Sequence, residues 1–203
     1  MQPPSVAYRV GKTAFDLTFA VLLLPIVVPV LLLCALAIRV ESDGPIIFTQ
    51  LRTGRHGRRF RMFKFRTMVK NAEELKASLQ HLNILPPPDF KIIDDPRITR
   101  VGRFLRKTSL DELPQILNVL LMQMSFVGPR PTSFAPSTYD VWHSERLEVT
   151  PGITGLWQVK GRNSMTFDER LRLDIDYVRN RSFKLDVKIL SLTAGAVISR
   201  SGA

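Results

Sequence analysis

The sequence predicts an α+β fold, mostly helical, in a monotopic membrane protein. Three observations carry this prediction: a long apolar segment near the N-terminus that contains prolines, a strongly basic stretch behind it, and short strand and helix patterns in the remainder. We expect a membrane-inserted re-entrant helix in residues 1–40 and a domain at the cytoplasmic face in residues 41–203. That second domain should contain a small β-hairpin and amphipathic helices at the membrane interface.

The apolar segment lies between Asp16 and Arg39 and comprises 22 uncharged residues. A straight helix of that length would be about 33 Å long, enough to cross a hydrocarbon core of about 30 Å. Pro25 and Pro29 each remove a backbone hydrogen bond and predict a bend near the middle. Because basic residues flank both ends, both ends are expected on the cytoplasmic side. We therefore favour a re-entrant hairpin broken at these prolines over the alternative, a single kinked span.

Basic charge is concentrated in the first part of the chain. Residues 1–110 contain 18 Lys and Arg against 8 Asp and Glu, whereas residues 111–203 contain 11 against 10. Between Arg52 and Lys70, inclusive, there are eight basic residues and no acidic one. Such a block indicates a negatively charged partner: nucleic acid, anionic lipid or a phosphorylated substrate. Directly behind a membrane segment, it favours an anionic membrane surface.

Short elements are predicted behind the apolar segment. Residues 45–50 and 58–68 read as strands joined by a turn at residues 54–57, which predicts a β-hairpin. Residues 70–82 have a helical pattern. Residues 183–198 mix apolar and charged side chains, as a helix lying at a membrane interface does.

Two adjacent carboxylates, Asp111 and Glu112, are candidate functional residues. Ser109 and Glu112 have the spacing of a capping box, but Pro114 would then lie inside the helix. We therefore expect Asp111 as the N-cap of a helix whose apolar face lies within residues 113–121. Both carboxylates could be simple helix caps. Near arginines at a helix N-terminus, an ionised carboxylate would stay charged well below neutral pH and could attack phosphorus or hold Mg²⁺.

Other stretches support a phosphate site. Arg130 stands between two prolines in GPRP, a rigid mount for a bidentate phosphate contact. Residues 150–163 form a Gly-rich stretch that ends with Arg162 and Asn163, although a plain connector has the same composition. The DID triplet, residues 174–176, is a weak signal that also fits a helix surface.

Several stretches, in this order, resemble the bacterial sugar transferases, the monotopic phosphoglycosyl transferases. They are KFRTM (64–68), RVGRFLRKTSLDELPQILNVL (100–120), MSFVGPRP (124–131), PGITGLWQVKGRN (151–163) and LDIDYVRNRSFKLDVKIL (173–190). The resemblance runs from the apolar segment to about residue 190. With no large N-terminal domain, the chain is similar to the short form of the family.

This resemblance implies an enzyme that moves a sugar 1-phosphate from a UDP-sugar to undecaprenyl phosphate. It implies a Mg²⁺ cofactor and a covalent aspartyl-phosphosugar intermediate. The reaction would begin the synthesis of a bacterial glycoconjugate such as capsule, O-antigen, exopolysaccharide or a glycoprotein glycan. The location implied is the cytoplasmic face of the inner membrane, in contact with anionic lipids and without a nucleic-acid partner.

The resemblance also assigns residues. Asp111 would be the nucleophile, and Glu112 would help to place the metal or support attack by the acceptor. Family positions associated with the substrate phosphates and nucleotide fall on Lys64, Arg106, Arg130, Arg162 and Asp186. The family commonly has Ser before the central proline of its re-entrant helix, whereas Leu24 precedes Pro25 here.

Two other classes of function fit parts of the sequence. A membrane-tethered module that binds nucleic acid or anionic lipid without catalysis would bind in a salt-sensitive way and be indifferent to Asp111 and Glu112. A scaffold for glycan assembly would show no turnover with any sugar donor. The sequence does not identify the sugar, the glycan pathway or the oligomeric state.

Overall fold

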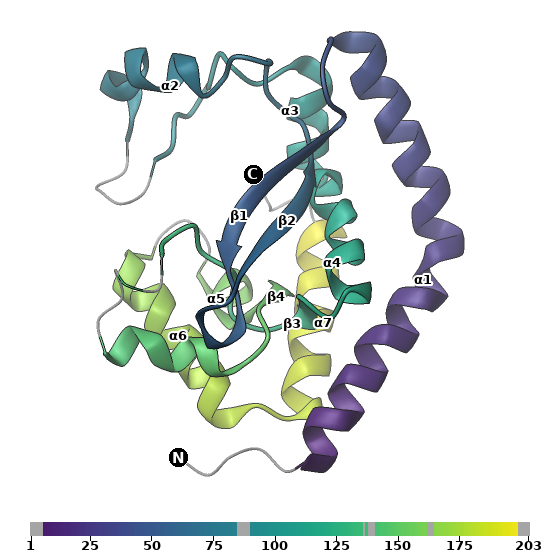
Figure 1. Cartoon of the computed structure of the whole chain (residues 1–203), viewed down its shortest axis with the longest axis vertical. Coiled ribbons are helices and arrows are strands. Elements are labelled where there is room, and N and C mark those ends of the chain that lie inside the picture. The colour runs from purple at the N-terminus through teal and green to yellow at the C-terminus, as the bar shows by residue number, and fades with distance from the viewer. Residues whose placement is uncertain (1–5, 85–89, 136, 138–140, 162–164, 199–203) are drawn as a thin grey trace.

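The computed structural model describes residues 6–84, 90–135, 137, 141–161 and 165–198, and the structural statements below concern these residues. A long N-terminal helix lies along one side of a body made of shorter helices and two small sheets (Figure 1). The predicted α+β, mostly helical class is confirmed.

The N-terminal helix, α1, runs without interruption from Val6 to Glu41. Pro25 and Pro29 lie inside it, and Figure 1 shows the helix bowed around the body. The expected bend is therefore present, but the prolines do not divide the segment into two helices. Its 36 residues correspond to about 54 Å. The re-entrant arrangement in a membrane stays a prediction.

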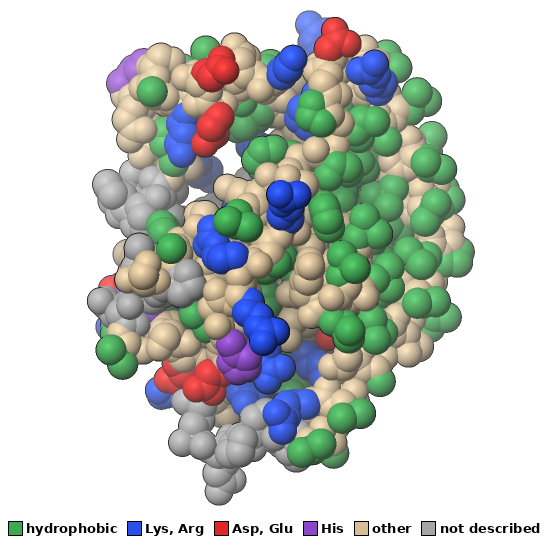
Figure 2. Space-filling view, viewed as in Figure 1, with side chains coloured by type: hydrophobic (Ala, Val, Ile, Leu, Met, Phe, Trp, Pro, Cys, Tyr) green, Lys and Arg blue, Asp and Glu red, His purple; other side chains and the backbone are tan. Residues whose placement is uncertain are grey.

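Most of α1 is exposed. Its buried residues are Asp16, Ala20, Val27, Cys34 and Ile38. Large apolar side chains that stay more than half exposed include Val21, Leu22, Ile26, Leu32, Leu33 and Leu36. Figure 2 shows this apolar surface gathered on one side of the molecule. An apolar surface of this extent, on a helix long enough to cross a bilayer, is consistent with membrane anchoring.

The predicted β-hairpin is present. β1 (Ile47–Thr53) pairs antiparallel with β2 (Arg59–Phe65), with Ile47 opposite Phe65. Phe60 and Met62 are buried, and Lys64 follows them at the two-residue spacing of a strand. The side chain of Lys64 therefore points to the same inner face of the hairpin.

The body contains six further α-helices within the described residues. They are α2 (Glu74–Ser78), α3 (Arg100–Lys107), α4 (Ile116–Leu120), α5 (Leu156–Lys160), α6 (Phe167–Asn180) and α7 (Phe183–Ile198). The predicted helix at 183–198 is confirmed. The predicted helix at 70–82 is only partly correct, because α2 is short and a separate 3₁₀ turn follows at Gln80–Leu82.

A second, parallel sheet joins β3 (Ser125–Val127) to β4 (Gly152–Thr154), and the sequence did not predict it. The backbones approach so closely that a Cβ on Gly152 would lie 2.1 Å from the Gly128 nitrogen. Only glycine permits this approach. The pairing fixes the residues that follow β3, including Arg130, against the body.

Candidate active site

Asp111 and Glu112 lie in a 3₁₀ helix, Leu110–Gln115, between α3 and α4. The predicted N-cap is wrong: Ser109 precedes the first helical residue, has a φ of 57° and makes no capping hydrogen bond with its side chain. This left-handed residue turns the chain between α3 and the carboxylates. Because Pro114 has no N–H to donate, regular α-helix begins only at Ile116.

The predicted apolar face behind the carboxylates is only partly buried. Ile116 is buried, but Leu117 and Leu121 are exposed. The physical reason is the length of α4, which has only five residues, so the expected stripe does not extend over several turns. The exposed leucines add to the apolar surface of the molecule.

Glu112 is held by two cations. The Lys64 Nζ lies 2.7 Å from its Oε1. Arg130 donates from Nη1 to Oε2 at 3.2 Å and from Nη2 to Oε1. This is a bidentate, charge-assisted contact, and both oxygens of Glu112 are used in it.

The neighbouring Asp111 is chemically different. Its carboxylate accepts no hydrogen bond and forms no ion pair with any described residue. Burial raises the pKa of Asp111 and Glu112 adds to the increase, whereas Lys64, Arg106 and Arg130 oppose it. The expected lowering of this pKa is therefore not found, because burial outweighs the cations. The structure leaves Asp111 as the open carboxylate of the pair.

The pKa of Glu112 moves the other way. Burial favours its neutral form, but Arg130 and Lys64 outweigh burial and hold the pKa of Glu112 well below its usual range. Burial lowers the pKa of Lys64, and Glu112 opposes that change. Two adjacent carboxylates whose pKa values are driven apart are typical of sites that divide chemical roles between them.

The structure brings three of the four predicted basic residues close to the carboxylate pair. Lys64 comes from β2 and Arg130 from the segment after β3, and both contact Glu112. Arg106, near the end of α3, donates from Nε to the Thr67 hydroxyl at 2.9 Å and lies close enough to oppose the rise in the Asp111 pKa. Arg162 lies outside the described residues.

Asp186 belongs to a different group of side chains. Its carboxylate accepts hydrogen bonds from Tyr177 at 2.7 Å and Tyr8 at 3.1 Å, and it lies 3.2 Å from the Lys12 ammonium. These contacts join α7 to α6 and to the first turns of α1. Its contacts thus tie helices together and do not reach the carboxylate pair.

The two aspartates of the DID triplet, residues 174–176, lie in different environments. Asp174 is buried and accepts a hydrogen bond from Arg146 Nε at 3.0 Å. Arg146 in turn donates to the backbone carbonyl of Arg130, so this buried pair supports the segment that presents Arg130. Asp176 is exposed and accepts a hydrogen bond from Asn180. Asp174 and Ile175 are therefore buried inside the body, and only Asp176 lies on the helix surface.

Two supporting residues were not predicted from the sequence. Asn118 is fully buried; it accepts a hydrogen bond from the Phe63 amide and donates to the Arg61 carbonyl, which fixes β2 beside α4. Thr67 positions Arg106. In the sequence, Asn118 is a single amide inside an apolar run. A buried amide must find hydrogen-bond partners, so this position could have been recognised as a structural hydrogen-bonding residue.

The donor set for a metal is small. No group of three or more His, Cys, Asp or Glu side chains in the described ranges is arranged to hold a metal. Mg²⁺ commonly binds through one or two carboxylates while substrate phosphates and water complete its shell. Of the two carboxylates, Asp111 is the one that no described residue engages, and it is therefore the one available as such a ligand. Glu112 would first have to release a cation.

Comparison with known proteins gives consistent matches. Residues 7–200 match the bacterial sugar transferase family. The chain is 46% identical over 201 residues to an undecaprenyl-phosphate galactose phosphotransferase of Salmonella typhimurium and 41% identical over 200 residues to a UDP-galactose-lipid carrier transferase of Erwinia amylovora. Each match covers 96% of this chain but 42% of the relative.

A relative of similar length also matches. The uncharacterized sugar transferase EpsL of Bacillus subtilis is 41% identical over 193 residues, which cover 94% of this chain and 89% of the relative. The family match spans α1, the hairpin, the carboxylate pair and α7. The chain therefore belongs to the bacterial sugar transferase family.

Proposed function

We propose that the protein transfers a sugar 1-phosphate from a UDP-sugar to undecaprenyl phosphate. The observation that carries this proposal is the open carboxylate of Asp111 beside the cluster of Lys64, Arg130 and Glu112. The names of two relatives, a phosphotransferase acting on undecaprenyl phosphate and a UDP-galactose-lipid carrier transferase, support the two substrate classes. The product would start the synthesis of a bacterial glycoconjugate.

Asp111 is the nucleophile in this proposal. Its Oδ attacks the sugar-bearing phosphorus, an Asp–phosphate bond forms, and the bond to the bridging oxygen of the diphosphate breaks with loss of UMP. A phosphate oxygen of undecaprenyl phosphate then attacks the same phosphorus and displaces Asp111 as a free carboxylate. The product is a diphosphate-linked lipid sugar, and the carboxylate is regenerated.

The cations have a positioning and electrostatic role. Lys64 and Arg130, held in place by Glu112, present positive charge where the donor phosphates gather negative charge during transfer. Arg106 adds charge from α3. Glu112 is a positioning residue, because its own oxygens are used by the two cations. When bound, Mg²⁺ would offset phosphate charge beside Asp111.

The proposed location is the cytoplasmic face of the inner membrane, with α1 entering the bilayer and returning to the same side. One substrate is water-soluble and the other is confined to the bilayer, so the site must lie at the membrane surface. The exposed apolar side chains of α1 and the basic block behind it support placement at a membrane surface. The return of α1 to the same side rests on the basic residues at both ends of the apolar segment and on Pro25 and Pro29.

Trapping the covalent intermediate tests the reaction. Protein incubated with a UDP-sugar radiolabelled in the β-phosphate, without acceptor, should become labelled and release UMP. Hydroxylamine should remove the label, as expected of an acyl phosphate. Asp111→Asn should lose labelling and at least about 10³-fold of turnover, since nucleophile loss leaves only binding contributions.

The matched control is Asp176→Asn, the same chemical change at an exposed carboxylate of α6. It should label and turn over as the unchanged protein does. Normal turnover by Asp111→Asn would overturn the assignment of the nucleophile. A screen of UDP-sugars for UMP release with undecaprenyl phosphate and Mg²⁺ identifies the donor, and no release with any donor would favour the scaffold or binding-module alternatives.

A further inference from the structure

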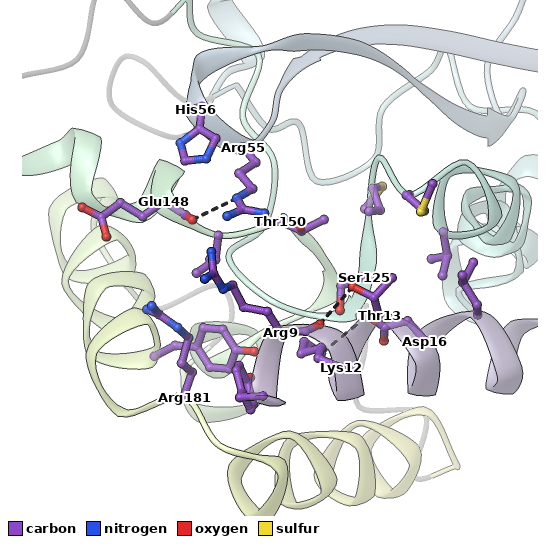
Figure 3. Close-up of a pocket in the computed structure, with 17 residues that line it drawn as sticks. Arg9, Lys12, Thr13, Asp16, Arg55, His56, Ser125, Glu148, Thr150 and Arg181 are labelled. Atoms are coloured by element: carbon purple, nitrogen blue, oxygen red, sulfur yellow. Dashed lines mark hydrogen bonds and ion pairs between the residues drawn. The ribbon is translucent and has the colours of Figure 1, made fainter. Parts of the chain in front are cut away.

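A cavity of about 380 Å³ lies apart from the carboxylate pair. Its walls are the first turns of α1, the turn between β1 and β2, the residues before β4 and the linker between α6 and α7 (Figure 3). Lys64, Asp111, Glu112 and Arg130 do not line it. The proposed transfer reaction therefore assigns no role to this space.

Three arginines from distant parts of the chain meet at this cavity. Arg9 comes from α1, Arg55 from the hairpin turn and Arg181 from the linker before α7. Figure 3 shows Arg9 and Arg55 directed toward one another. Like charges brought together without a counter-ion raise the energy of the site, and this cost is removed when an anion binds between them.

The described residues do not supply that anion. Arg55 donates from Nε to the Glu148 carbonyl at 3.2 Å, and Arg181 donates to the Val178 carbonyl, so both contacts are with neutral backbone. The Arg9 guanidinium has no hydrogen bond or ion pair within the described ranges. None of the three arginines is paired with a described carboxylate.

The acidic groups near the cavity are engaged elsewhere. Asp16 lies 3.7 Å from the Lys12 ammonium and accepts a hydrogen bond from the Phe126 amide. Lys12 also pairs with Asp186, so this group of one ammonium and two carboxylates offers no positive charge to a ligand and has a formal net charge of −1. Figure 3 shows the Glu148 carboxylate directed away from the arginines. The positive charge available to a ligand is that of Arg9, Arg55 and Arg181.

The rest of the lining mixes polar and apolar side chains, and its apolar part lies near α4 and β3. Leu17, Val119 and Met124 contribute to it, together with Met122, whose side chain is 65% exposed. On α1, beside Arg9, Val10 is 64% exposed. The cavity thus combines three arginines with apolar side chains, one of which, Met122, is exposed at the surface. A ligand that fits both features carries a phosphate and a hydrocarbon chain.

We propose that this cavity binds the phosphate head of a membrane lipid. The phosphate lies among Arg9, Arg55 and Arg181, and the hydrocarbon chain leaves past Met122 toward α1. Arginine suits this role because its planar donors bind phosphate oxygens in pairs. Such a lipid would tie α1 to the hairpin turn and to the linker before α7. The inference does not depend on the transfer reaction.

Binding to the full-length protein in detergent tests the proposal by native mass spectrometry. Phosphatidylglycerol, undecaprenyl phosphate and inorganic phosphate are titrated in separate experiments. We expect retention of at least one of the two phosphate-bearing lipids. Arg9→Gln and Arg55→Gln, both exposed in the structure, should each weaken it about tenfold or more, the range for a lost charge-assisted hydrogen bond.

Arg61→Gln is the matched control, because Arg61 is also exposed on the hairpin but does not line the cavity. Its lipid affinity should equal that of the unchanged protein. Preference for phosphatidylglycerol would identify a resident phospholipid, and preference for undecaprenyl phosphate would identify an entry site for that lipid; both outcomes support the proposal. Equal affinity in all variants, or retention of inorganic phosphate alone, would overturn it.

Discussion

At the scale of single residues, the adjacent carboxylates Asp111 and Glu112 differ in their contacts because the fold gives them different neighbours. Glu112 binds Lys64 and Arg130 through both oxygens, whereas Asp111 receives no hydrogen bond from the described residues. The motif alone does not show which carboxylate is engaged. The arrangement follows from the inward direction of Lys64 on β2 and from the position of Arg130 after β3.

Glu112→Gln should therefore lower stability. The change leaves two cations without a counter-charge, which should cost about 2 kcal/mol at neutral pH, the range for hydrogen bonds to charged groups. Because the folded pKa of Glu112 lies below the usual glutamate value of 4.5, its contribution is present above that pH and is lost as the pH falls. The deficit relative to the unchanged protein should shrink below pH 4.5.

Denaturant unfolding in detergent between pH 3 and pH 8 measures this effect. Glu145→Gln is the control, because Glu145 pairs with Arg179, whose side chain is 60% exposed. An exposed pair of this kind should contribute less than about 1 kcal/mol. A constant deficit across the whole pH range would show that charge on Glu112 is not what stabilises the site.

At the scale of elements, the close packing of α3 positions Arg106. Gly102, in the first turn of α3, lies so near residue 67 that an added Cβ would be 2.1 Å from the Thr67 carbonyl oxygen. Thr99 caps the helix by accepting a hydrogen bond from the Gly102 amide, and its own amide donates to the Thr67 carbonyl. Thr67 then holds Arg106. One glycine thus permits the contact that places a cation near Asp111.

Gly102→Ala should destabilise the protein by about 1–3 kcal/mol, because backbone atoms cannot move away as a flexible side chain does. Gly195→Ala is the matched control. Gly195 lies in α7 with nothing within 4 Å of an added Cβ, so the same change should be neutral or stabilise by about 0.5–1 kcal/mol. Thermal unfolding of the two variants measures the difference. Equal effects at both positions would contradict the packing argument.

At the scale of the whole molecule, one long apolar helix organises the protein. Its exposed side chains form a broad apolar surface, while its few buried residues contact the body (Figure 2). A surface of this kind is favourable in the hydrocarbon core of a bilayer. Placement of this surface in a membrane is consistent with the membrane-bound acceptor proposed for the protein.

The re-entrant topology is tested by cysteine labelling. Cys34, the single native cysteine, is replaced by Ala, and one new cysteine is placed at Val10 or at Val40, near the two ends of α1, where both positions are exposed. In sealed inverted vesicles an impermeant maleimide should label both variants equally, because the proposed topology places both ends of α1 on the cytoplasmic side. Labelling at one end only would show that α1 spans the bilayer.

The sequence by itself determined the apolar segment, the hairpin, the α+β class and the family, because hydrophobic periodicity, turn residues and ordered motifs are local properties of the chain. It also identified Asp111, Glu112, Lys64 and Arg130 as candidates. Only the tertiary structure decided that Ser109 precedes the 3₁₀ helix, that Glu112 rather than Asp111 takes the cations, and that Asp186 lies with Tyr177.

The physical reason is that these outcomes depend on contacts between distant segments. The direction of the Asp111 pKa shift reflects the balance of burial against charges brought from β2, α3 and the segment after β3, and no local pattern contains that balance. The same holds for the cavity of Arg9, Arg55 and Arg181. In the sequence these are three scattered arginines within a basic chain, and only the fold places them around one space.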